Sequence, residues 1–142
     1  MNIIIADDEP LALEMTCEAV REVCPKANIY PFSKPSRLLE FAKETRCKIA
    51  FLDICMRGVS GIDVAKQLKE RHANRVFVCT TYGLFTDGLD KFDEYYEKGY
   101  IDRVITTNLN YRDPELLTKP YYIEANMSKY LASIIDIINH DV

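Results

Sequence analysis

Residues 49–72 read IAFLDICMRGVSGIDVAKQLKERH, and this stretch decides the fold. Its first four residues are apolar and end at Asp53, which is typical of a strand buried on both faces. Ser60 is suited to cap a helix over residues 60–72, with Asp63 at the fourth position of a weak capping box. A strand, a loop and an amphipathic helix in succession are the repeating unit of a parallel sheet covered by helices.

The same unit recurs on both sides of this stretch. Strands are expected over residues 3–6, 28–32, 76–79 and 103–106, and helices over residues 10–23, 36–45, 86–98 and 128–139. Residues 121–124 are a candidate sixth strand, after a polar loop over 108–120 with a helical turn at 115–117. Helical spacing predicts two inward faces, Leu11, Met15, Ala19/Val20 and Val23 in the first helix and Leu131, Ile134, Ile135 and Ile138 in the last.

Strict alternation of strands and helices predicts one α/β domain over residues 1–142. We expect a flavodoxin-like, doubly wound parallel sheet in three layers, with strand order 2-1-3-4-5.

The composition fits a globular chain that stays in water. Of the 142 residues 48% are hydrophobic and 28% charged, and no long uninterrupted apolar run predicts a membrane span or a signal peptide. The net charge of −4 argues against a nucleic-acid surface and leaves no polybasic membrane patch. Five cysteines without a C-x-x-C pair predict neither a disulfide framework nor a zinc site, and they favour the cytoplasm.

Acidic residues follow two strands that this order makes neighbours. The first strand ends at Asp7-Asp8-Glu9, the third at Asp53, and the fourth at Thr80-Thr81. Carboxyl ends of parallel strands share one edge of the sheet, where Mg²⁺ suits a few carboxylates plus water. An aspartate there is a candidate nucleophile toward a phosphoryl group. The alternative is that Asp8 or Glu9 merely caps the following helix.

Two segments, IIIADDEPLALE (3–14) and FLDICMRGVSGIDVAKQLKE (51–70), resemble the receiver domain of two-component response regulators, nearest the type that precedes LytTR output domains. The resemblance implies that Asp53 is the phosphoacceptor and, with Asp8, a direct Mg²⁺ ligand. It also implies that Asp7 is an indirect ligand and that the backbone carbonyl of Cys55 is a further one. Thr80 is the candidate hydroxyl for the phosphoryl group.

The resemblance weakens along the chain. The family has a lysine at the end of the fifth strand, where this sequence reads Val104-Ile105-Thr106-Thr107-Asn108. Lys119-Pro120 has the right residue types but lies too far along the chain, and Arg57-Gly58 stands where Pro-Gly is usual.

Residues 74–142 resemble the C-terminal part of ribose-phosphate pyrophosphokinases, most clearly in TTYGLF (80–85) and TTN (106–108). That family's ribose-phosphate loop and its ATP-binding N-terminal domain are absent. Composition changes at the same place: residues 1–73 hold equal numbers of acidic and basic residues, whereas residues 74–142 carry the whole net charge and eight of the nine tyrosines.

We interpret this pattern as a chimera of a receiver-like half (1–73) and a pyrophosphokinase-like half (74–142), with a seam near 62–76. An engineered fusion is favoured, and a natural fusion is the alternative. Its acidic pocket is complete and its phosphorelay output is lost. One alternative is a functional receiver, and another is a pyrophosphokinase fragment with residual phosphate binding. We expect no enzymatic turnover beyond slow self-phosphorylation of Asp53 from a small donor. The expected partner is a second copy, through the tyrosine-rich C-terminal half.

Overall fold

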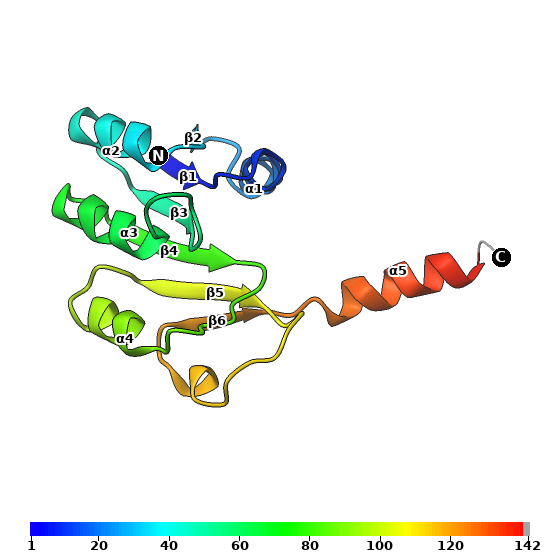
Figure 1. The fold of residues 1–142 in the computed structure, drawn as a ribbon. Helices are drawn as coiled ribbons and strands as arrows, with labels where there is room; N and C mark the ends of the chain where they lie inside the picture. Colours follow the sequence, from blue (N-terminus) through cyan, green and yellow to red (C-terminus); the bar gives the residue numbers. More distant parts are fainter. Residues whose placement is uncertain (141–142) are drawn as a thin grey trace.

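The computed structural model describes residues 1–140. Strands and helices alternate along them as predicted (Figure 1). The elements are β1 (Asn2–Ala6), α1 (Pro10–Val23), β2 (Asn28–Phe32), α2 (Pro35–Glu44), β3 (Ile49–Asp53), α3 (Gly61–Glu70), β4 (Arg75–Thr80), α4 (Asp90–Glu97), β5 (Arg103–Thr107), the 3-10 turn η1 (Leu116–Thr118), β6 (Tyr122–Ala125) and α5 (Ser128–His140).

All six strands are parallel, in the order β2-β1-β3-β4-β5-β6. The predicted order is therefore confirmed, and the candidate sixth strand forms the edge beside β5. The register aligns Ala50 with Val76, both fully buried, so the sheet continues without interruption across the predicted seam. Because the strands are parallel, their carboxyl ends meet at one edge.

The two faces of the sheet are covered unequally. One face packs against α2, α3 and α4 in a large core whose centre includes Leu38, Leu52, Val64, Leu68 and Val78. The opposite face packs against α1 in a smaller cluster built on Ile3, Ile5 and Cys17. The three-layer arrangement is thus present, but the second helical layer is thin.

The predicted inward face of α1 is wrong for most of its members. Leu11, Met15 and Val23 are exposed by 63%, 60% and 81%, whereas Leu13, Cys17 and Val20 lie toward the sheet. Spacings of four and three residues also align this second set along one side of a helix, and α1 presents that side.

The predicted inward face of α5 is wrong as well. Leu131, Ile135 and Ile138 are exposed, Ile134 is half-buried, and the helix extends away from the sheet (Figure 1). The physical reason lies in the two-residue junction after β6. Asn108 holds this junction, because its Oδ1 accepts from the N–H of Met127 at 2.8 Å and its Nδ2 donates to the hydroxyl of Ser128 at 3.1 Å.

Helix α4 is shorter than predicted. It starts at Asp90 rather than near residue 86, because residues 86–89 form a turn in which Gly88 has φ +80°. It ends at Glu97, before Gly99, whose φ of +72° suits the expected helix-terminating glycine. Along the described chain, no helix combines the length and apolar character needed to cross a bilayer.

Candidate functional site

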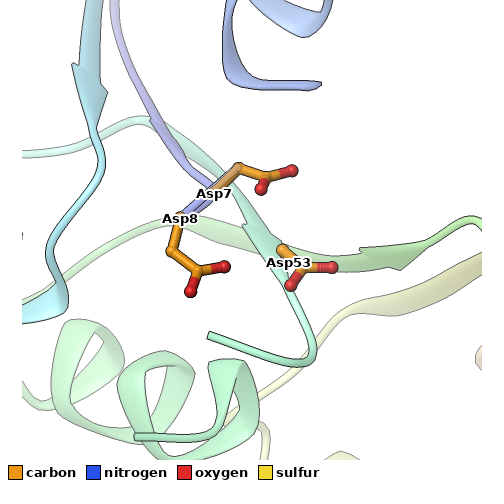
Figure 2. Close-up of side chains that lie close together, drawn as sticks. All are labelled: Asp7, Asp8 and Asp53. Atoms are coloured by element: carbon orange, nitrogen blue, oxygen red, sulfur yellow. The ribbon is translucent and has the colours of Figure 1, made fainter. Parts of the chain in front are cut away.

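Three carboxylates meet at the carboxyl edge of the sheet. Asp7 and Asp8 follow β1 directly, and Asp53 is the last residue of the neighbouring strand β3. One oxygen from each lies within 4.8 Å of the others, and all three residues are half-buried (Figure 2). The predicted convergence is confirmed, and the spacing suits a single cation between them.

Backbone N–H groups fix the direction of each carboxylate. Asp7 accepts from Glu9 at 2.8 Å, Asp53 from Cys55 at 2.9 Å, and Asp8 from Arg57 at 3.1 Å. These bonds hold the three carboxylates in the arrangement in which one oxygen of each lies within 4.8 Å of the others. The alternative role as a helix cap is not seen, since the N-cap of α1 is Glu9 and its side chain makes no capping bond.

Electrostatics disfavour full ionisation of Asp7 and Asp53 when no cation is bound between the three carboxylates. Partial burial raises the pKa of Asp53 above its ordinary value. The hydrogen bond from the Cys55 N–H lowers this pKa, whereas the negative charges of Asp7 and Asp8 raise it. Burial likewise raises the pKa of Asp7, with a further contribution from Asp8. Both effects disfavour the ionised form, and a bound cation would reverse both.

Gly61 allows the β3–α3 loop to close against Asp53. A Cβ at this position would lie 2.0 Å from the backbone oxygen of Asp53, so only glycine fits. The Gly61 N–H donates to Ile54 O at 2.9 Å, and the hydroxyl of Ser60 accepts from the Ile62 N–H, as the predicted N-cap should. Asp63 does not complete a capping box; it binds Lys91 and the hydroxyl of Tyr95 instead.

Arg57 is a contact that the sequence did not reveal. Its Nε lies 3.3 Å from Asp8 Oδ2, with a side chain that is 95% exposed. Such an exposed pair contributes little to stability. The only signal in the sequence was the departure at Arg57-Gly58.

Thr80 is half-buried at the end of β4. Together with Asp7 and Asp53 it lines a cavity of about 360 Å³ that also reaches Thr106 and Thr107 on β5. The structure therefore brings this predicted hydroxyl to the acidic edge. Cys55 lies two residues after Asp53 and is exposed, and the role of its backbone carbonyl as a ligand stays a prediction.

Lys119 does not replace the missing lysine of the fifth strand. It precedes the parallel strand β6 and so belongs to the amino edge of the sheet, opposite the acidic pocket. Its Nζ is held 2.7 Å from both Asp93 and Glu115. The end of β5 supplies threonines instead, and Thr107 donates to the carbonyl of Thr81.

Comparison with known proteins agrees with this geometry. The sequence profile of the response regulator receiver domain matches residues 3–103. The positive alginate biosynthesis regulatory protein of Pseudomonas aeruginosa is 36% identical over 60% of this chain and 35% of its own length. Response regulator RR06 of Streptococcus pneumoniae is 23% identical over 99% of this chain and 63% of its own length. The chain thus spans less than two thirds of these curated relatives.

Solved structures show the same fold. The response regulator protein TrrA of Thermotoga maritima, solved in complex with Mg(2+)-BeF, has a TM-score of 0.59 at 24% identity and covers 82% of this chain and 92% of its own. The chemotaxis response regulator CheY4 of Vibrio cholerae has a TM-score of 0.60 at 14% identity, covering 77% of this chain and 88% of its own. From the matched profile and the acidic edge it spans, we conclude that this chain belongs to the response regulator receiver domain family.

Proposed function

We propose that this chain is a phosphoacceptor receiver in which Asp53 takes up a phosphoryl group while Mg²⁺ is bound beside it. The observation that carries the proposal is the meeting of Asp7, Asp8 and Asp53 within 4.8 Å. Asp8 and Asp53 would bind the ion directly, together with the carbonyl of Cys55, and Asp7 would bind it through water. A related receiver fold bound to Mg(2+)-BeF supports this assignment.

The chemistry follows from the arrangement. A carboxylate oxygen of Asp53 attacks the phosphorus of a small donor such as acetyl phosphate, a P–O bond forms, and acetate leaves with the electrons of the broken bond. Mg²⁺ when bound neutralises charge on the phosphoryl oxygens. Thr80, on the adjacent strand, donates its hydroxyl to one of those oxygens. The chain is a stoichiometric acceptor, with no turnover of a separate substrate.

A single receiver is favoured over a junction of two half-domains. The family match continues to residue 103, well past the seam expected at 62–76. Neither the chimera nor a pyrophosphokinase fragment draws support from the relatives described above. The missing lysine of β5 still distinguishes this receiver, and we propose that Thr107 and Asn108 at that position give it a weaker response to phosphorylation.

Intact-mass measurement after incubation with acetyl phosphate and MgCl₂ tests the proposal. We expect one added phosphoryl group on the wild-type chain and none on Asp53→Asn. The matched control is Asp87→Asn, which removes an exposed acid outside the three-carboxylate cluster and should leave the modification intact. An unmodified wild-type chain, or equal modification of Asp53→Asn, would overturn the proposal.

A further inference from the structure

The sheet face that carries α1 is open beyond β3. Alternation along the strands places Phe77, Ile105 and Ile123 on this face, because Phe77 aligns with Phe51 of the α1 cluster and Ile105 aligns with Ile123. Phe77 and Ile105 are only half-buried, and Ile123 is 43% exposed. Helix α1 borders this open face on one side, because its residues Ala12 and Met15 line the same cavity as Ile105.

Helix α5 carries the complementary surface. At 100° per residue, its six large apolar side chains fall within about 160° of the helix circumference. They are Tyr130, Leu131, Ile134, Ile135, Ile137 and Ile138, and all but the half-buried Ile134 are exposed by 43–61%. Lys129, Ser133 and Asp136 occupy the opposite side. A helix with this pattern buries one face against another element in a stable protein.

The length of the apolar stripe on α5 matches the width of the open face measured across its strands. The stripe from Leu131 to Ile138 extends for about 10 Å along the helix. Three parallel strands, β4 to β6, span about 10 Å at the usual spacing between strands.

The helix cannot reach the open face of its own chain without breaking its junction. Asn126 and Met127 alone connect β6 to α5. Asn108 bonds to Asn126, Met127 and Ser128, at 3.3, 2.8 and 3.1 Å, and the Ser128 N–H is bound by Asn126 Oδ1 at 2.9 Å. These contacts direct α5 away from the sheet (Figure 1).

We propose that two copies of this chain exchange their α5 helices, each helix covering the open face of β4, β5 and β6 in the other copy. The contact is isologous, so both exposed surfaces of each copy are buried at once. If burying an aliphatic side chain removes on the order of 100 Å² from water, two such helix-on-sheet contacts between half-exposed side chains bury roughly 1,000 Å². That area reaches the lower limit for a specific interface.

The test is the molar mass of the full chain by size-exclusion chromatography with light scattering. We expect the wild-type chain to have twice the monomer mass and the double variant Ile135→Glu/Ile138→Glu to have the monomer mass. Neither side chain is buried, so far-UV circular dichroism should show an unchanged fold. The control Lys129→Glu changes the charge on the polar side of α5 and should remain dimeric.

A variant on the sheet distinguishes exchange from pairing between helices. Ile123→Lys should also give the monomer mass, because it places a charge under the incoming helix. Mixing it with Ile135→Glu/Ile138→Glu should restore dimers, with one native contact and one in which Glu faces Lys. A monomeric wild-type chain would overturn the proposal, and so would a dimer that Ile123→Lys leaves intact.

Discussion

Replacing Asp53 with asparagine should stabilise the metal-free protein. The substitution keeps the shape of the side chain and an oxygen to accept from the N–H of Cys55, now at 2.9 Å. It removes one negative charge that lies within 4.8 Å of the oxygens of Asp7 and Asp8. The dominant change is therefore the loss of two repulsive pairs.

Coulomb's law gives the size of the effect. Two unit charges 4.8 Å apart repel by about 3.5 kcal/mol at an effective dielectric constant of 20 and by about 1 kcal/mol in water. The three residues are half-buried and open to solvent, which places each pair near the lower figure. We expect Asp53→Asn to raise the free energy of unfolding by about 2 kcal/mol without Mg²⁺.

The pH dependence provides a second readout of the same interaction. Burial and neighbouring charge raise the pKa values of Asp7 and Asp53 in the folded chain above 3.8. The folded state then binds protons more readily than the unfolded state, so stability is greatest at low pH for these groups. It falls as the pH rises from 3.8 through the raised values. Asp53→Asn should flatten this fall.

Urea unfolding in EDTA and in excess MgCl₂ measures both effects. In EDTA the variant should be the more stable protein, whereas Mg²⁺ should stabilise the wild-type chain and have little effect on the variant. Asp87→Asn, which removes an exposed acid elsewhere, controls for the change in net charge. The reasoning fails if Asp53→Asn is no more stable than wild type in EDTA, or if Mg²⁺ stabilises both equally.

Two further predictions concern the surroundings of Asp53. Gly61→Ala should lower the free energy of unfolding by several times the roughly 1 kcal/mol expected of Gly99→Ala at its positive φ, because a Cβ at residue 61 would lie 2.0 Å from the backbone oxygen of Asp53. Urea unfolding measures both losses, and equal losses would contradict the steric argument. Burial, together with the negative charge of Asp53, raises the pKa of the Cys79 thiol to about 12. Near pH 8.5, where an ordinary thiol is about half-ionised, iodoacetamide should therefore leave Cys79 unmodified in the folded chain and modify it in urea. Peptide mass mapping measures this difference.

The sequence was sufficient to predict the sheet and the acidic edge for a specific reason. Runs such as Ile3-Ile4-Ile5 and Ile49-Ala50-Phe51-Leu52 end at acids, and parallel pairing brings those ends together whatever the details of packing. Helix boundaries followed from local chemistry too, as at the Ser60 cap and Gly99. Each of these features is set by residues that lie close together in the sequence.

The helix faces could not be predicted in this way. In α1 two apolar stripes compete, and the sheet selects Leu13 and Cys17 over Leu11 and Met15. In α5 the apolar face was recognised correctly but was assigned to the interior, because helical spacing says which residues share a side and nothing about what covers it. The bonds from Asn108 that direct this helix outward depend on residues 18–20 positions away.

The open face and the acidic pocket are continuous. Asp7 and Asp53 line the same 360 Å³ cavity as the apolar side chains of Met15 and Ile105. A helix lying over those apolar side chains would exclude water beside the carboxylates, and a lower local dielectric strengthens their attraction for a divalent cation. Exchange of α5 should therefore tighten Mg²⁺ binding, and by linkage Mg²⁺ should tighten the dimer by the same factor. Titration calorimetry with MgCl₂ should give a weaker affinity for Ile135→Glu/Ile138→Glu than for the wild-type chain, although neither residue lines the pocket; equal affinities would show that the two sites act independently.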